Sequence, residues 1–200
     1  MLDYEINNLP NKIIIGCDEV GRGCLFGPLV VACVMLPKNY INLQIKDSKL
    51  LNKQKREILY KKIINEAVEY HIEIRDVDTI NQSNPKQESI NGMQIAISKF
   101  KNIPDVVLTD YEKININYPQ INLIKGDNIA LSVATASILA KVTRDKIMFD
   151  LDNKYPLYGF KKHKGYATKQ HLQAIQQYGL IDGLYRIKYK PIQQFLLKKN

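Results

Sequence analysis

Two acidic residues beside a glycine-rich turn constrain this chain more than any other feature of its sequence. Asp18 and Glu19 come soon after the apolar residues 13–15, which predict a short, fully buried strand. Carboxylates that close to a core are costly unless a partner or a cation compensates their charge. The Gly-Arg-Gly turn at residues 21–23 lets the backbone approach a ligand closely. The stretch therefore indicates a site for a metal and a phosphate group, with a solvated acidic turn as the alternative.

Two further aspartates occupy comparable positions downstream. Residues 106–110 predict a buried strand that ends in Asp110, and residues 121–124 predict another that leads into Asp127. Functional sites of α/β sheets gather beyond the carboxyl ends of parallel strands, so we expect the acidic side chains to lie together. Ligand sets made only of oxygen favour Mg²⁺ or Mn²⁺. Two such ions, roughly 4 Å apart, can activate water and stabilise the leaving oxygen of a phosphodiester. A helix cap is the alternative role for Asp127.

Two geometric conditions limit this constellation. Neighbouring residues of a strand point to opposite faces, so Asp18 and Glu19 share a site only if the strand ends or kinks there. Gly21 permits such a kink. Asp145 follows Asp127 by 18 positions, which is roughly 27 Å along a continuous helix. We therefore leave Asp145 out of the metal site and interpret it as a structural feature or part of the outer rim.

The remaining periodicity predicts one α/β domain over residues 1–200, a mixed sheet flanked by helices. Strands are expected at residues 13–15, 29–36, 68–77, 106–110 and 121–124. Helices are expected at about residues 53–67, 85–100 and 129–148. From about residue 155 to residue 200 the chain is more basic and predicts a small helical annex, in which Thr168 caps a helix that runs to residue 179.

The charge of the chain points to a polyanionic partner. Its 29 Lys and Arg outnumber 20 Asp and Glu, which gives a net charge of +9. A lysine-rich surface that only confers solubility is the plainer alternative. The three cysteines, Cys17, Cys24 and Cys33, indicate reduced thiols, because their number is odd and no secretory leader precedes them. No apolar run is long enough to span a membrane, so we expect a cytoplasmic protein without membrane association.

Taken together, several of these stretches resemble the motifs of the ribonuclease HII family. They are residues 18–23 with 27–28, and residues 47–49, 109–110, 125–127, 136–145 and 163–168. They occur in the order of the family and span most of the chain, so as a set they are highly specific. The resemblance implies a ribonuclease H-like fold with a mixed five-stranded sheet.

The resemblance also implies an activity. The expected reaction is cleavage of the RNA strand of RNA–DNA hybrids, and incision 5′ of single ribonucleotides in duplex DNA. It would depend on Mg²⁺ or Mn²⁺, with two ions in the active complex, and would leave 5′-phosphate and 3′-hydroxyl ends. Such an enzyme serves ribonucleotide excision repair and DNA replication, and we expect it to act as a monomer on these nucleic acids.

The resemblance assigns roles by position. The four metal-binding and catalytic carboxylates are expected to be those of Asp18, Glu19, Asp110 and Asp127. The ribose 2′-hydroxyl, which distinguishes RNA from DNA, is expected to meet the backbone of Gly21, Arg22 and Gly23. Tyr166 is expected to stack on the neighbouring deoxyribose. Lys49 and the lysines around His163 are expected to contact phosphates, although Asp47 or Ser48 beside Lys49 is as readily a helix cap.

One departure and two other functions remain open. Phe26 looks more like the sister family, ribonuclease HIII, whose members usually carry a sizeable N-terminal domain, whereas 12 residues precede residue 13 here. The alternative is therefore a ribonuclease HIII-like hybrid nuclease without single-ribonucleotide incision. A non-catalytic nucleic-acid-binding module would not need four carboxylates. A phosphatase or DNA nuclease would leave the Gly-Arg-Gly turn and Tyr166 unexplained.

Overall fold

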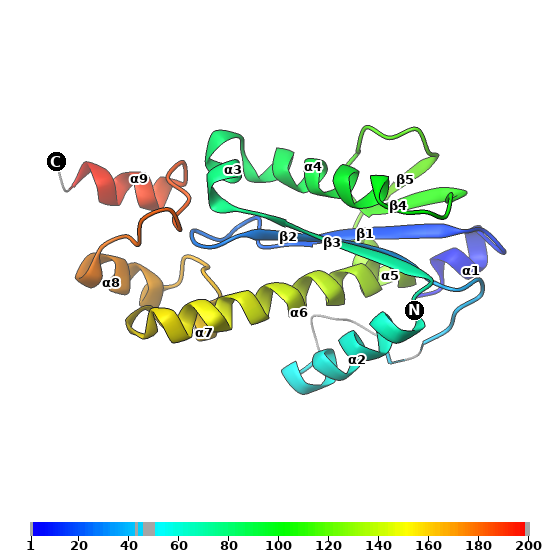
Figure 1. Ribbon diagram of the computed structural model, residues 1–200, viewed down its shortest axis with the longest axis horizontal. Helices are drawn as coiled ribbons and strands as arrows, with labels where there is room; N and C mark the ends of the chain where they lie inside the picture. The colour runs from blue at the N-terminus through cyan, green and yellow to red at the C-terminus, as the bar shows by residue number, and fades with distance from the viewer. Residues whose placement is uncertain (1, 43, 46–50, 199–200) are drawn as a thin grey trace.

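A mixed sheet of five strands, in the order β3-β2-β1-β4-β5, lies at the centre of the described residues (Figure 1). The computed structural model describes residues 2–42, 44–45 and 51–198. The strands are β1 (Ile14–Val20), β2 (Leu29–Met35), β3 (Glu69–Arg75), β4 (Val106–Asp110) and β5 (Gln120–Leu123). β2 pairs antiparallel with β1 and β3, while β4 runs parallel to β1 and β5. This arrangement confirms the mixed five-stranded α/β sheet that the resemblance implied.

Strand β2 is apolar throughout because helices cover both of its faces. Val30, Ala32 and Val34 pack into the cluster formed with α6 (Leu131–Lys154) and α2 (Lys53–Glu66). Leu29, Val31 and Cys33 pack on the opposite face, against α4 (Pro85–Ser98). Figure 1 shows these layers, with α3 (Val77–Gln82) and α4 above the sheet and α2 and α6 below it.

The small residues of α6 let this helix lie close to β1. A Cβ atom added at Gly16 would come closer than 3.0 Å to Ser132, backbone included. The N-terminus of α6 is fixed by Glu5 of α1 (Tyr4–Asn8), whose carboxylate accepts hydrogen bonds from the N–H groups of Leu131 and Ser132. Close packing of the predicted small-residue helix on the sheet is therefore confirmed.

The long helix differs from its predicted form at its start. Ala130 has extended backbone angles, φ −111° and ψ 125°, which separate the short helix α5 (Gly126–Ile129) from α6. The predicted start of α4 is confirmed, since the Asn84 side chain accepts a hydrogen bond from Gln87 N–H at 2.9 Å and Pro85 occupies the first turn.

The chain after α6 forms the predicted helical annex. Its elements are η1 (Pro156–Tyr158), α7 (Phe160–His163), α8 (Lys169–Tyr178) and α9 (Lys190–Leu197). Phe26 is fully buried there and stacks on Phe160, with ring centroids 3.8 Å apart. The Arg186 N–H donates a hydrogen bond to Leu25 O at 2.9 Å. The annex is thus joined to the loop between β1 and β2, and Phe26 is explained by this packing.

Two further expectations concern cysteines and membrane spans. Cys17, Cys24 and Cys33 are free thiols and all three are buried. None of the helices in the described residues combines the length and the apolar character that crossing a membrane requires.

Candidate active site

Most of the predicted site residues come together in one cleft of about 440 Å³. The cleft is lined, among others, by Asp18, Glu19, Gly21, Arg22, Gly23, Asp110, Asp127 and Tyr166. Strands β1 and β4, helix α5 and the segment between α7 and α8 therefore contribute to one site. Lys49, with Asp47 and Ser48, lies outside the described residues.

The cleft does not arise in the way that the sequence predicts. Strand β1 neither ends nor kinks at the acid pair, because Asp18 and Glu19 stay in register with Ala32 and Val31 of β2. The parallel ladder between β1 and β4, by contrast, stops at the pair Cys17 and Thr109. The two acids therefore lie just past the last β1–β4 pair, and the cleft opens where these two strands are no longer paired.

Asp18 is held in a buried, polar position on the α6 side of β1. Its carboxylate accepts a hydrogen bond from Glu19 N–H at 2.8 Å, and the Ser137 side chain of α6, which lines the same cleft, favours its ionised form. Burial, reinforced by the charge of Glu19, raises the pKa of Asp18 well above its usual range. A cation in the cleft would oppose that shift, because positive charge favours the ionised carboxylate.

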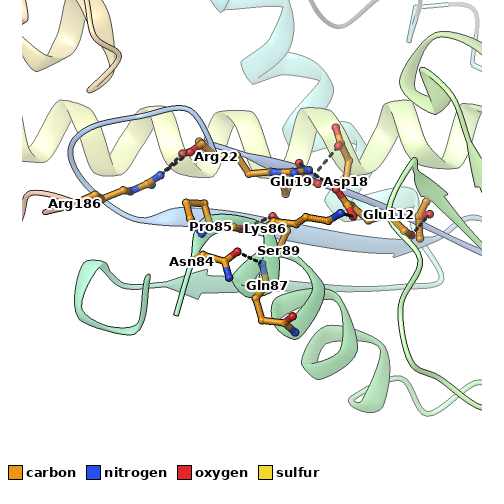
Figure 2. Close-up of polar contacts among 12 residues, drawn as sticks. Asp18, Glu19, Arg22, Asn84, Pro85, Lys86, Gln87, Ser89, Glu112 and Arg186 are labelled. Atoms are coloured by element: carbon orange, nitrogen blue, oxygen red, sulfur yellow. Dashed lines mark hydrogen bonds and ion pairs between the residues drawn. The ribbon is translucent and has the colours of Figure 1, made fainter. Parts of the chain in front are cut away.

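Glu19 belongs to a partly buried ion-pair network on the other side of β1 (Figure 2). Nη1 of Arg22 lies 3.1 Å from Glu19 Oε1 and 2.8 Å from Glu112 Oε1. Lys86 of α4 lies 3.7 Å from the second oxygen of Glu112. Burial raises the pKa of Glu19 to about 7, even though Arg22 opposes the shift. The guanidinium of Arg22 is thus held by two carboxylates at the edge of the cleft.

Asp110 and Asp127 are placed by the end of β4 and the start of α5. Asp110 is the last residue of β4, and its Oδ1 accepts a hydrogen bond from Gly126 N–H at 2.8 Å. Asp127 is 2% exposed and lies in the first turn of α5, whose N-cap position belongs to Lys125. Asp127 is therefore not the N-cap residue of this helix.

These carboxylates fit a hard divalent cation by their chemistry. All of them are oxygen donors, and Glu19 Oε2 is buried without a hydrogen-bond partner among the described residues. Within those same parts of the chain, however, no three His, Cys, Asp or Glu side chains are grouped so as to hold a metal ion. The donors line one cleft, while Glu19 is drawn toward Arg22.

The glycine turn and Tyr166 form the other wall of the cleft. Gly21 has a φ of +106°, and a Cβ atom there would overlap the buried side chain of Arg144. Gly23 lies against Tyr166, whose Cε1 would be 3.7 Å from a Cβ added at Gly23. Tyr166 is 42% exposed, so much of its ring stays accessible beside the turn.

Sequence patterns alone missed several residues of the site. They are Arg56, Glu112, Ser137 and Lys141, of which all but Glu112 line the cleft. Glu112 lies two residues after the strand-end Asp110, and Ser137 and Lys141 lie in the motif of residues 136–145. Neither signal shows which of these polar side chains reaches the cleft, and Arg56 lies in no motif.

Two residues of the motifs lie outside the cleft lining. Asp145 forms an ion pair with Lys141 at 2.7 Å, in agreement with its interpretation as part of the rim. His163 is buried in the annex, where its Nε2 lies 2.8 Å from Tyr158 O and its ring stacks on His171 at 4.4 Å. Its contacts are those of a structural histidine.

Comparison with known proteins gives one consistent family. The family model described as Ribonuclease HII matches residues 15–191. Ribonuclease HII of Mycoplasma capricolum is 48% identical over 195 residues, which cover 96% of this chain and 91% of that protein.

Solved structures share the fold. The ribonuclease H2 from Pyrococcus horikoshii OT3 has a TM-score of 0.81 at 24% identity, over 94% of this chain and 99% of that one. Bst-RNase HIII, solved in complex with Mn²⁺, has a TM-score of 0.75 at 19% identity, over 96% of this chain and 71% of that one. Both likenesses concern the fold.

Proposed function

Because the chain belongs to the ribonuclease HII family, whose members are metal-dependent ribonucleases H acting on RNA–DNA hybrids, we propose that it also incises duplex DNA 5′ of single ribonucleotides. One observation carries this proposal. The acidic residues, the glycine turn and Tyr166, which lie far apart in the sequence, line the same cleft. A hybrid nuclease of the ribonuclease HIII kind would need the acids and a way to recognise ribose, but not an aromatic ring that disfavours a hydroxyl on the next sugar.

The four carboxylates have a defined task in this proposal. Asp18, Glu19, Asp110 and Asp127 would hold Mg²⁺ or Mn²⁺, with Glu19 Oε2 left available while Oε1 is paired with Arg22. Two such ions supply an activated water and stabilise the leaving oxygen of the phosphodiester. Ser137 favours the ionised form of Asp18. The expected products carry 5′-phosphate and 3′-hydroxyl ends.

Substrate recognition falls to the opposite wall. Backbone groups of Gly21, Arg22 and Gly23 would meet the ribose 2′-hydroxyl, because this hydroxyl is the group that marks a ribonucleotide in DNA. The exposed ring of Tyr166, beside Gly23, would stack on the next sugar and disfavour a second hydroxyl there. Arg56 and Lys141 line the same cleft, and the net charge of +9 favours binding to phosphates.

The test compares three substrates. A DNA duplex with one ribonucleotide, a long RNA–DNA hybrid and an all-DNA duplex are incubated with Mg²⁺ or Mn²⁺, and again with a chelator. We expect a metal-dependent nick 5′ of the ribonucleotide, cleavage of the hybrid and no cleavage of the all-DNA duplex. Cleavage of the hybrid alone would reject single-ribonucleotide incision.

A single substitution separates an enzyme from a binding module. Asp110→Asn replaces a carboxylate of the cleft by a neutral amide of the same shape. We therefore expect turnover to fall by at least 10²-fold, while the affinity for the duplex stays within a few-fold of the wild-type value. Cleavage rates and fluorescence anisotropy measure the two quantities. Asp78→Asn, on helix α3, is the matched control and should leave both unchanged. Full activity of Asp110→Asn would remove this residue from the mechanism.

We also propose that the protein acts in the cytoplasm as a monomer of one domain, in ribonucleotide excision repair and DNA replication. The basis is the basic surface and the completeness of the cleft within one chain. Light scattering at the concentration of the cleavage assay would show a mass near 23.0 kDa. A dimer that dissociates with loss of activity would contradict the monomer.

A further inference from the structure

Arg186 of the annex is a fully buried cation whose hydrogen bonds go to the back of the glycine turn. The side chain is 0% exposed and forms no ion pair with a carboxylate among the described residues. Its Nη1 donates to Gly21 O at 2.7 Å and to Arg22 O at 3.0 Å (Figure 2). Its Nε and Nη2 donate to Gly27 O at 3.2 and 2.9 Å. Three backbone carbonyls and the Tyr189 hydroxyl, which accepts from Nη1 at 3.2 Å, thus compensate a charge that is expensive to bury.

The geometry of the peptide bond links these carbonyls to the cleft. Every peptide bond of the described residues is trans, so each carbonyl points away from the N–H of the next residue. Because Arg186 binds the carbonyls of Gly21 and Arg22, the N–H groups of Arg22 and Gly23 point away from it. Both residues line the cleft, and among the described residues neither N–H donates a hydrogen bond.

The bound guanidinium also changes the strength of these donors. A hydrogen bond to the carbonyl of a peptide polarises the group, so its N–H becomes a better donor. The effect is larger when the donor to the carbonyl is charged and shielded from water. The Tyr189 hydroxyl donates to Arg22 O as well and lies 3.2 Å from Arg186 Nη1. Two annex side chains therefore act on the same peptide.

We propose that Arg186 is a positioning residue that determines sugar specificity, by aiming and polarising the N–H groups of Arg22 and Gly23 toward the ribose 2′-hydroxyl. This inference rests on the proposed function of the cleft and adds a role for the annex. The annex is then a part of the recognition site. Its backbone hydrogen bonds to Leu25 and Gly27 hold the loop that contains the glycine turn after β1.

Arg144 provides a matched comparison within the same region. It too is 0% exposed and donates only to backbone carbonyls, those of Phe26, Pro28 and Lys164. It binds neither carbonyl of the two peptides that face the cleft. Arg144→Lys and Arg186→Lys therefore disturb burial to a similar extent, while only the second removes the bonds to the turn. Lysine keeps the charge but cannot reproduce the planar fork of bonds.

The first experiment measures sugar discrimination. Affinities for a duplex with one ribonucleotide and for the all-DNA duplex are compared in the presence of a chelator, at a temperature at which each variant is folded. We expect Arg186→Lys to lower the ratio of these affinities about tenfold, which is the order that a hydrogen bond to a charged group contributes. Arg144→Lys should lower the ratio less, because Arg144 packs against Gly21 without binding the carbonyls of Gly21 and Arg22. Equal loss in both variants, or no loss in either, would overturn the inference.

The second experiment needs no substrate, so it stands even if the proposed function fails. In ¹H–¹⁵N spectra of the free protein, the amide proton resonances of Arg22 and Gly23 should move upfield in Arg186→Lys. They should move by a smaller amount in Arg144→Lys, because Arg144 packs against Gly21 but does not bind these peptides. Unmoved resonances would contradict the polarisation directly. If the wild type shows no preference for the ribonucleotide but the resonances move, the geometry holds and the sugar assignment is wrong.

A milder variant covers the case in which Arg186→Lys does not fold. Tyr189→Phe removes one hydroxyl donor to Arg22 O and keeps the guanidinium. We expect it to lower the discrimination ratio in the same direction by a few-fold, with a shift of the Gly23 amide resonance and none at Arg22. A Tyr189→Phe protein with the ratio and the Gly23 resonance of the wild type would count against the proposal.

Discussion

Arg22, in the glycine turn, contacts two acidic side chains through a single nitrogen atom. Nη1 binds Glu19 and Glu112 at once, at 3.1 and 2.8 Å. A cation that binds Glu19 competes with Arg22 for that carboxylate, whereas Glu112 draws the guanidinium away. Glu112 is 3% exposed, so its charge acts on Arg22 with little screening by solvent. The more strongly Glu112 attracts Arg22, the more freely Glu19 can bind a metal ion.

Glu112→Gln tests this balance at the level of a single residue. Without the second negative charge, Arg22 is left with Glu19 as its one acidic partner, so we expect Mn²⁺ affinity to fall roughly fivefold, about 1 kcal/mol. Titration calorimetry measures the affinity in the absence of nucleic acid. Glu57→Gln, which alters an exposed ion pair with Lys53, is the control and should have no effect. Unchanged affinity in Glu112→Gln would mean that Glu112 only stabilises the fold.

At the scale of elements, the site depends on how closely α6 lies against β1. Gly16 leaves no room for a side chain, because Ser132 of α6 occupies the position of its Cβ atom. Helix α6 also carries Ser137, which favours the ionised form of Asp18. A shift of this helix therefore moves one wall of the cleft relative to the carboxylates of the sheet.

Gly16→Ala tests the contact between the two elements. The added methyl group overlaps the backbone of Ser132, and neither the strand nor the helix end can rotate away, so we expect a loss of about 3 kcal/mol of stability. Urea unfolding measures the loss. Gly23→Ala serves as the control, because its Cβ would meet Tyr166 at an ordinary 3.7 Å. Equal stability of the two variants would show that α6 can move outward without cost.

At the scale of the whole molecule, the annex is held to the sheet by a buried cluster that contains two histidines. His171 is 0% exposed, stacks on His163, and its Nε2 lies 3.0 Å from the Tyr185 hydroxyl. Burial lowers the pKa of His171 to about 4. Burial also lowers the pKa of His163. The docking of the annex therefore favours neutral imidazoles.

The sign of the pH dependence follows from this shift. The unfolded chain takes up a proton on His171 below its ordinary pKa of 6.5, whereas the folded protein resists protonation down to about 4. Stability is full above pH 6.5 and falls as the pH drops from 6.5 to 4, by about 3 kcal/mol in total from this group.

Thermal unfolding between pH 7.5 and 4.5 measures this effect. We expect the melting temperature of His171→Gln to depend less on pH than that of the wild type. Identical pH slopes in wild type and His171→Gln would rule out the role of this imidazole.

The class of the sheet, most element positions and most residues of the cleft could be predicted from the sequence. Periods of two and of about 3.6 residues mark strands and helices because each element buries one face. Asp110 follows an apolar run for the same local reason. The motifs around Asp18, Asp127 and Tyr166 were specific enough to indicate the family, and their side chains do line one cleft.

How that cleft opens and which contacts hold its walls could be learned only from the folded chain. It opens because the pairing of β1 with β4 stops at Cys17 and Thr109, not because β1 ends at the acid pair. Glu112 reaches Arg22 across 90 positions of the chain, and Arg186 reaches Gly21 across 165. Such pairs leave no periodic pattern in the sequence, because their two members lie far apart along the chain. They stabilise one another only after folding has buried them side by side. The contacts that aim the turn therefore became visible only in the folded chain.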